Sequence, residues 1–437
     1  TYAGGFSEGV EFWKVPQTYE DGRNPSIGRD RKAGPGRFLA AILQKKDPLN
    51  MPVINRVADR ADEISDWRRD LHMHPELQYE VHRTAAFVAN KLKDFGCDEI
   101  VTGIGQTGVV GVIHGRKSDG KVIGLRADMD ALPIEEETGL AYASKTPGKM
   151  HACGHDGHTA MLLGAAQHLC ETRNFAGTAI VIFQPAEEGG AGAKAMLDDG
   201  LLDRFKIEQV FGMHNYPGLP IGTFAIRPGP LMAAADRLWI EIEGVGGHAA
   251  RPHKSVDTVL VGSAIVTALQ QIVSRNVDPL DNAVVSITLF QAGHTDNVIP
   301  QHALLRGTCR SLKTEVRDLL ERRVTEVAQG VALLHGARAN VRYQRDYPVV
   351  VNHPEATDFA ISVARDVVGE GRVDPSVTPV MGGEDFAFML QERPGAFIFM
   401  GNGDTANLHH PAYDFNDKAI PFGTSYWVRL VETAMPG

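Results

Sequence analysis

The chain has 437 residues, of which 43% are hydrophobic and 22% are charged, so it can bury a large core and form two domains. Its formal net charge of −10 argues against nucleic acid or an anionic membrane as its main partner, and no apolar run approaches the roughly 18 residues of a membrane span. The four cysteines are far apart in the sequence, which argues against a disulfide framework and favours the reducing cytoplasm.

The N-terminal part of the chain shows no clear period. Residues 1–50 are rich in Gly, Pro and Arg, so we interpret them as a flexible leader or extension outside the fold. From Ile54 to Leu71 the apolar spacing predicts a helix that ends before Pro75. Four apolar runs that end in polar residues follow, at 121–130, 178–190, 210–215 and 396–403. Such continuous runs are typical of strands buried on both faces of a mainly parallel sheet, with helices such as 159–169 covering them.

The middle of the chain has a different pattern. A strand-like segment, a helix, two strand-like segments, a helix and a last strand-like segment occupy 236–244, 256–275, 283–290, 303–311, 314–335 and 339–347. This order is that of a ferredoxin-like domain. The predicted fold class is therefore α/β, with a mixed, mainly parallel sheet flanked by helices and an inserted ferredoxin-like α+β domain. We expect this insertion at 236–346, between the two parts of the first domain at 51–235 and 347–437.

Residues with metal-binding side chains follow the predicted strands. They are Cys153 and His155 in "HACGHDGH", Glu187 and Glu188, His214, and the pair His409 and His410. The carboxyl ends of parallel strands meet at one edge of a sheet, so we expect these side chains to converge there. Thiolate, imidazole and carboxylate groups are the ligands that zinc and its first-row neighbours bind.

The adjacent glutamates suggest two different roles for the two carboxylates. In an extended segment, neighbouring side chains point to opposite sides, so one glutamate could bind metal while the other acts as a general base. Two alternatives to a metal site remain at this point. Cys153 could be a thiol nucleophile with His155 or His158 as its base, or the octapeptide could be a polar loop. Neither accounts for the carboxylates and the distant histidines, so the pattern favours a metal site.

The ordered motifs carry a family resemblance. They are "LHMHPEL", "HACGHDGHTAMLLGAA", "FQPAEEGGAGAKAML", "GMHNYPGLPIG", "GHAARPH", "DNVIPQHALLRGTCR", "GGEDFAF" and "LHHPAYDFND", and they extend from residue 71 to residue 417. The chain resembles the amidohydrolase subgroup of the dinuclear metallopeptidases, which includes hippurate hydrolases, N-acetyldiaminopimelate deacetylases and plant hydrolases of indole-acetyl amino acids. The resemblance implies a zinc-peptidase-like catalytic domain and an inserted lid and dimerisation domain.

The resemblance also implies a metal site. Two divalent ions (Zn, Mn, Co or Ni) would be bridged by Cys153, Glu187 would be the base, and the remaining ligands would be His155, Glu188, His214 and His409. More distant relatives carry His-x-Asp where this chain has Arg126-Ala127-Asp128. Because arginine cannot bind a metal ion, we expect Asp128 to support the ligands from behind, with His155 taking over the missing ligation.

Further residues are implied to bind the substrate. By resemblance, His248 of a dimer partner helps to polarise the scissile carbonyl, Asn297 and Arg310 hold the carboxylate of the substrate, and Gly382 and Gly383 let the backbone approach the substrate. The expected protein is a cytoplasmic homodimer or higher homo-oligomer that hydrolyses small N-acyl amino acids. A dipeptidase or aminopeptidase of the same superfamily and a non-catalytic metal-binding homologue are the alternatives.

Overall fold

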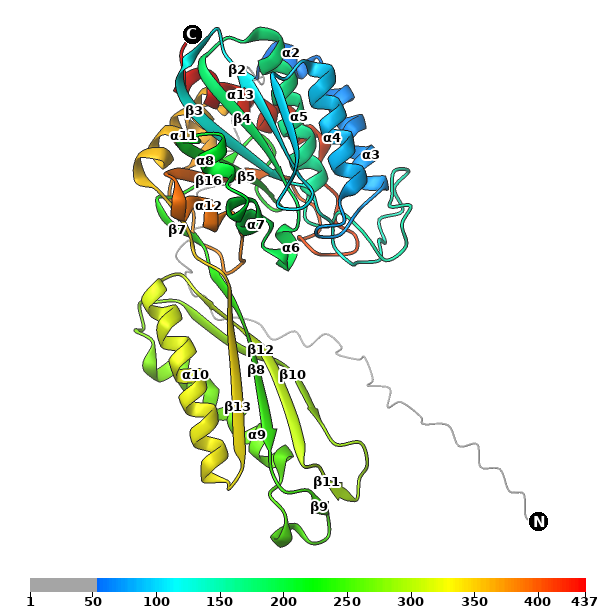
Figure 1. Ribbon diagram of the computed structural model, residues 1–437, viewed down its shortest axis with the longest axis vertical. Helices are drawn as coiled ribbons and strands as arrows, with labels where there is room; N and C mark the ends of the chain where they lie inside the picture. The colour runs from blue at the N-terminus through cyan, green and yellow to red at the C-terminus, as the bar shows by residue number, and fades with distance from the viewer. Residues whose placement is uncertain (1–52) are drawn as a thin grey trace, which may run out of the picture. The chain divides into compact units, whose positions relative to one another are not determined.

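The computed structural model describes residues 53–437. The predicted leader, residues 1–50, lies outside the described residues. The described chain forms a large domain with helices around a central sheet, and the chain between the two parts of this domain forms a smaller inserted domain (Figure 1).

The large domain is built on an eight-stranded sheet. Its strands are β1 (Glu99–Ile104), β2 (Gly108–His114), β3 (Lys117–Asp128), β4 (Ala176–Gln184), β5 (Gln209–Tyr216), β6 (Phe224–Ala225), β15 (Val373–Asp374) and β16 (Gly395–Gly401). They follow the order β1-β2-β4-β3-β5-β16-β6-β15. The central strands β4, β3, β5 and β16 run parallel, whereas β2 pairs antiparallel with β4, and β1 pairs antiparallel with β2. The predicted mixed, mainly parallel sheet is confirmed, and the four apolar runs form its central strands.

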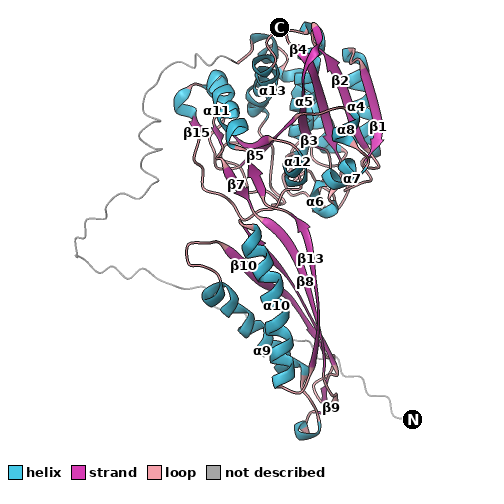
Figure 2. Ribbon diagram, turned by 60° about the vertical axis from the view of Figure 1, so that its left-hand side comes forward, coloured by secondary structure: helices cyan, strands magenta, loops and turns pink. Residues whose placement is uncertain are grey.

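Helices cover both faces of this sheet (Figure 2). One face packs against α3 (Ala61–Met73), α4 (His82–Phe95), α5 (His155–Thr172), α11 (Pro354–Val368) and α13 (Ile420–Ala434), and the other against α7 (Gly192–Asp198), α8 (Leu201–Arg204) and α12 (Ala387–Glu392). Along β4, Val181 and Phe183 enter the first core while Ile180 and Ile182 enter the second. Burial on both faces explains why the sequence shows continuous apolar runs instead of alternation.

The first predicted helix is divided in two. The structure has α2 (Asn55–Ala58) and then α3, with a break at Asp59 and Arg60, whereas the sequence spacing predicted one helix from Ile54 to Leu71. Arg60 leaves the helical conformation, with φ of −105° and ψ of 6°, and its guanidinium binds Glu171 of α5. A contact with another element therefore outweighs the local helical pattern here.

The inserted domain has its own sheet and core. Its elements are β8 (Ala234–Glu243), α9 (Thr258–Gln271), β10 (Ala283–Ala292), β12 (His302–Ser311), α10 (Thr314–Leu334) and β13 (Arg338–Tyr347). The sheet order β10-β12-β8-β13, with every pair antiparallel, is that of a ferredoxin-like domain, as predicted. A separate two-stranded ribbon pairs β9 (Gly247–His248) with β11 (Val298–Ile299). Near the entry and exit of the insertion, β7 (Gly229–Met232) pairs with β14 (Val350–Asn352).

Candidate active site

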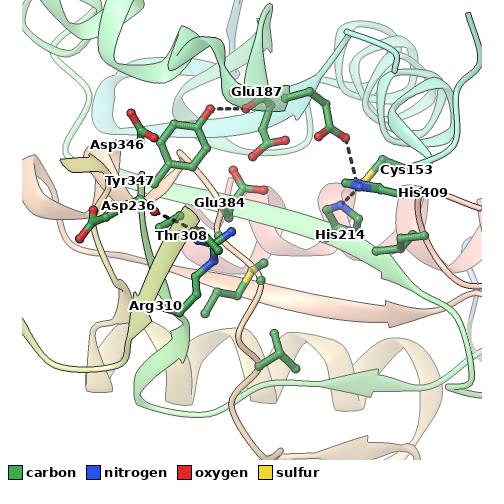
Figure 3. A pocket seen from close by; sticks show the side chains of 18 of the residues that line it. Cys153, Glu187, His214, Asp236, Thr308, Arg310, Asp346, Tyr347, Glu384 and His409 are labelled. Carbon is green, nitrogen blue, oxygen red and sulfur yellow. Dashed lines mark hydrogen bonds and ion pairs between the residues drawn. The ribbon is translucent and has the colours of Figure 1, made fainter. Parts of the chain in front are cut away.

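A cavity of about 580 Å³ lies at the carboxyl edge of the large sheet and is lined by residues of both domains. Figure 3 shows Cys153, His214 and His409 together on one side and Arg310 of the inserted domain on another, with Glu187 and Glu384 between them. The sheet edge explains this convergence, because His214 lies in β5, Glu187 follows the end of β4, and Cys153, Glu384 and His409 come from loops and turns.

Five predicted metal ligands come together in this cavity and directly beneath it. The ligand atoms of Cys153, His155 and His214 all lie within 4.8 Å of one another, and so do those of Cys153, Glu188 and His409. Cys153 Sγ is 3.4 Å from His214 Nε2, and Glu188 Oε1 is 3.3 Å from His409 Nε2 and 3.9 Å from His155 Nε2. Because Cys153 belongs to both groups, its position suits a ligand shared between two ions.

The orientation of the histidine rings fits metal binding. His155 Nδ1 donates to the carbonyl of Asp130 at 2.8 Å, and His214 Nδ1 donates to the carbonyl of Asn215 at 2.6 Å. A carbonyl can only accept, so each ring carries a proton on Nδ1 and directs Nε2 into the cluster, as metal-binding histidines do. His155 Nε2 and Glu188 Oε1 are buried with no hydrogen-bond partner among the described residues. These two unpaired ligand atoms, with the thiol of Cys153 beside them, fit a first-row divalent ion.

The glutamate pair lies in a turn, which corrects the expectation of an extended segment. Glu187 begins the short helical segment α6 (Glu187–Gly190), and the residue before it, Ala186, has a left-handed φ of 53°. Both carboxylates consequently reach the same cluster, where their oxygens and His155 lie within 4.8 Å of one another. The carboxylate of Asp130 holds the turn by accepting from the backbone N–H groups of Glu187 and Glu188, each at 3.0 Å.

Electrostatics argue against the thiol alternative. Burial, reinforced by Glu188 and Glu187, raises the pKa of the Cys153 thiol well above its ordinary value. Burial also lowers the pKa of the neighbouring His214 well below its usual range, so this pair stays as thiol and neutral imidazole. Cys153 therefore lacks the activated state of a nucleophile, and a cation in the cluster is what would favour its thiolate.

Glu187 has the environment of a general base. It is buried, and burial together with the nearby Glu384 and Glu188 raises its pKa well above the usual range. A carboxyl group with a raised pKa holds a proton more readily than an ordinary glutamate, which suits a group that must accept a proton and then return it.

Beneath the site, one buried arginine is surrounded by three carboxylates. The guanidinium of Arg126, which is 1% exposed, binds Asp128 at 2.7 Å and both Glu384 and Asp385 at 3.0 Å. Asp128 also binds His158 at 2.6 Å and approaches His155 Nε2 to 3.6 Å. Asp128 is thus tied to Arg126 and His158, while Glu384 and Asp385, which the sequence left without a role, neutralise Arg126.

The predicted substrate-binding residues fall into two places. Arg310, Gly382 and Gly383 line the cavity, whereas His248 and Asn297 do not. His248 lies in β9 and Asn297 directly precedes β11, and the backbone N–H of Ala249 donates to the carbonyl of Asn297 at 3.0 Å.

Gly383 has a structural reason to be a glycine. A Cβ atom at this position would lie 2.8 Å from the Cβ of Ala235, so the absence of a side chain lets the start of β8 pass close by. Gly382 accepts a backbone hydrogen bond from Ala233 at 2.9 Å. Both glycines therefore contact the segment that leads into the inserted domain.

Comparison with known proteins decides the family. Residues 124–433 match peptidase family M20/M25/M40. The chain belongs to this family. The hippurate hydrolase of Campylobacter jejuni is 43% identical over 380 residues, which cover 87% of this chain and 98% of that protein. The N-acetylcysteine deacetylase of Bacillus subtilis is 42% identical over 377 residues, covering 86% and 98%.

A solved structure agrees with this assignment. The YXEP protein of Bacillus subtilis, a dinuclear metal-binding peptidase of the M20 family, matches with a TM-score of 0.75 and 37% identity, covering 86% of this chain and 99% of that one. The protein is therefore a hydrolase of the M20 family, and the resemblance read from its motifs is confirmed.

Sequence reasoning missed two side chains that shape the site of this M20 hydrolase. Asp130 holds the backbone of the glutamate turn, and the hydroxyl of Tyr347 donates to the carbonyl of Glu187 at 2.5 Å. Asp130 stands two residues after Asp128 at the end of an apolar run, so its position was a usable signal. Tyr347 gave no such signal, because it ends a strand of the other domain.

Proposed function

We propose that this protein is a two-metal amidohydrolase that cleaves N-acyl amino acids into a carboxylic acid and a free amino acid. The observation that carries the proposal is the convergence of five metal-ligating side chains and the buried Glu187 beside a cavity that also contains Arg310. Hippurate and N-acetylcysteine, after which two of the relatives are named, are both N-acyl amino acids.

The metal ligands follow from the donor set. Cys153 would be shared between two ions, and His155, His214, Glu188 and His409 would complete their protein ligands. The donor set suits Zn, Mn, Co or Ni. When bound, such ions supply Lewis acidity and a water molecule of lowered pKa. Glu187 would accept the proton of the attacking water and return it to the nitrogen that leaves the amide.

Arg310 would bind the carboxylate of the amino acid. Its guanidinium donates to Thr308 Oγ1 and to the carbonyl of Cys309, the latter at 3.0 Å. Within residues 53–437 it forms no ion pair, which keeps its charge available for a ligand. A planar guanidinium can hold a carboxylate through two parallel hydrogen bonds. Met232, Val380, Phe399 and Leu408 provide apolar lining for the acyl group.

The proposal includes a homodimer in which His248 acts on the site of the partner. The backbone N–H of Ala250 donates to His248 Nδ1 at 3.2 Å, so the ring proton is on Nε2 and can be donated to a developing oxyanion. His248 is exposed and does not line the cavity of its own chain. In a dimer, His248 of one subunit would be able to reach the active site of the other subunit.

One surface of the inserted domain suits such a dimer. β10 is an edge strand with no charged residue, and Phe290 on it is 40% exposed and packs against Gly262 of α9. The stretch Thr258–Asn276, which contains α9, is long and apolar enough to cross a membrane by length and composition alone, which corrects the expectation that no apolar stretch approaches the length of a span. Only 33% of its apolar window is buried. Leu260 on it is 58% exposed. An uncharged edge strand beside an apolar helix face supports pairing with a second copy.

Complementation between two inactive variants tests the dimer. We expect Glu187→Gln and His248→Ala to be inactive separately. Mixed dimers would have one site with an intact Glu187 that receives His248 from the partner, so random mixing should restore about a quarter of the wild-type activity. A mixture that stays inactive although mixed dimers are detected would contradict a shared site.

A hydrolysis panel tests the activity itself. Benzoyl, acetyl, succinyl and indole-acetyl amino acids would be offered to enzyme that has been stripped of metal and reloaded with each ion. We expect turnover only after reloading and only with a free substrate carboxylate. A requirement for a free α-amine would identify a dipeptidase or aminopeptidase instead, and two bound ions without turnover of any substrate would identify a non-catalytic homologue. We also propose a cytoplasmic location, which the four free cysteines support.

A further inference from the structure

The turn that carries Glu187 and Glu188 has a strained backbone. Ala186 and Ala191, which flank it, have left-handed φ values of 53° and 57°, a conformation that residues with a Cβ atom rarely adopt. Gly189 between them is left-handed as well, with φ of 82°. Such a segment persists only where its surroundings hold it in place.

Side chains of the large domain hold part of this turn. The hydroxyl of Tyr79 donates to the carbonyl of Gly190 at 2.7 Å, and Gln78 Nε2 donates to the carbonyl of Glu188 at 3.2 Å. With the two bonds from the backbone N–H groups of Glu187 and Glu188 to Asp130, they fix the start, the middle and the end of the turn. Neither Tyr79 nor Gln78 forms a hydrogen bond with the carbonyl of Glu187 or with the N–H of Ala191.

Tyr347 forms hydrogen bonds with both of these backbone groups. Its hydroxyl donates to the carbonyl of Glu187 at 2.5 Å and accepts from the backbone N–H of Ala191 at 3.2 Å. One oxygen atom thus spans the turn from the residue of the expected base to its far end. Figure 3 shows the Tyr347 ring beside the cavity with its hydroxyl directed at the Glu187 backbone.

Tyr347 does not belong to the large domain, because it is the last residue of β13. The chain enters the inserted domain at β8 and leaves it at β13, and Tyr347 pairs with Ala235 across these two strands. The register shifts between Arg345 and Tyr347, so Asp346 is left without a partner in a bulge. A bulge re-aims the side chain that follows it, and here it directs Tyr347 to the turn.

The residue in the bulge is itself fixed. Asp346 forms an ion pair with Arg237 of β8, with Nη2 of Arg237 2.9 Å from Oδ1 of Asp346. The ring of Tyr347 also packs edge-on against Phe388, with 6.3 Å between ring centroids. The ion pair and the bulge fix the backbone at Tyr347 relative to β8, and the packing on Phe388 of α12 holds its ring against the large domain.

We propose that Tyr347 is a positioning residue through which the inserted domain places Glu187. A displacement of β13 carries the hydroxyl with it and shifts the carbonyl of Glu187 and the amide of Ala191. The orientation of the expected base therefore depends on the domain that also supplies Arg310 to the cavity. The inference rests on the proposed function, because it takes Glu187 as the base.

Tyr347→Phe removes the hydroxyl and keeps the ring, and Tyr343→Phe is the matched control. Tyr343 lies on the same strand and its hydroxyl donates to Asp236 Oδ2 at 2.8 Å, without bonding the turn. We expect Tyr347→Phe to lower kcat by about ten-fold or more while KM changes by less than about two-fold, because a misplaced base slows the chemical step more than it weakens substrate binding. Tyr343→Phe should leave both constants near their wild-type values.

The absorption spectrum of cobalt-loaded protein gives a readout that does not depend on turnover. Glu188 follows Glu187 in the turn, so we expect Tyr347→Phe to change the visible cobalt bands and Tyr343→Phe to leave them unchanged. Wild-type kcat and an unchanged cobalt spectrum in Tyr347→Phe would overturn the inference, as would equal effects of the two variants. If the wild-type protein hydrolyses no substrate of the panel, the proposed function fails, while the spectrum still decides whether Tyr347 positions the turn.

Discussion

His72 should make the stability of the protein depend on pH. Its ring is fully buried beside Asp156, the residue after the expected ligand His155, and Nδ1 lies 2.8 Å from Asp156 Oδ2. Nε2 lies 3.4 Å from Glu136 Oε1. Burial opposes protonation of His72, but the bonds to Asp156 and Glu136 outweigh burial and the opposing charge of Arg68, and raise its pKa to about 9.

This pKa determines how the free energy of unfolding changes with pH. An unfolded histidine titrates near pH 6.5, so the folded protein holds the His72 proton more tightly than the unfolded chain. The resulting stabilisation is complete below about pH 6.5 and is lost as the pH rises through about 9. A difference of about 2.5 pH units at about 1.4 kcal/mol per unit corresponds to about 3 kcal/mol of unfolding free energy.

Urea unfolding at pH 6.5, 7.5 and 9.5 measures this effect in metal-loaded protein. His72→Gln should lower the free energy of unfolding at pH 6.5 and at pH 9.5. The loss should be about 3 kcal/mol larger at pH 6.5 than at pH 9.5. His82→Gln is the control, because His82 is exposed and, within residues 53–437, pairs only with the exposed Glu80. If the difference between wild type and His72→Gln is the same at all three pH values, His72 is not held as a cation by its neighbours, and the reasoning is wrong.

Three substitutions test the proposed chemistry. Glu187→Gln should lower kcat by about 10³-fold while both ions stay bound, as measured by metal analysis of the purified variant, and surviving turnover would refute the base assignment. Cys153→Ser should reduce the bound metal, whereas a variant that is inactive with full metal content would restore the thiol mechanism. Arg310→Ala should raise KM by about ten-fold or more for substrates with a free carboxylate, so an unchanged KM would remove Arg310 from the binding site.

The fold was predictable because it leaves strong local signals. Strands buried on both faces require continuous apolar runs such as 178–183, and the alternation of the inserted domain reflects a sheet with one buried face. The break between α2 and α3 left no such signal. It depends on Glu171, a residue on a helix about 110 positions away in the sequence.

The candidate site was predictable only as a set of residues that meet at one edge. The sequence placed Cys153, His214 and Glu188 after buried strands, and the structure brings them together. It did not give the shape of the glutamate turn, because the left-handed Ala186 is held by bonds from distant residues and not by its own preference. Local propensity therefore predicted an extended pair where tertiary contacts impose a turn.

Arg126 shows how one buried charge can organise such a site. It contributes a fixed positive charge that must be neutralised because it is buried. Asp128, Glu384 and Asp385 all bind its guanidinium, which gives the acidic pair of "GGEDF" a physical reason. Burial and neighbouring carboxylates raise the pKa values of Glu384 and Asp385, although Arg126 opposes this. Cations in the adjacent cluster would favour the ionised forms of both groups, so the buried Arg126 is compatible with a site that holds two divalent ions.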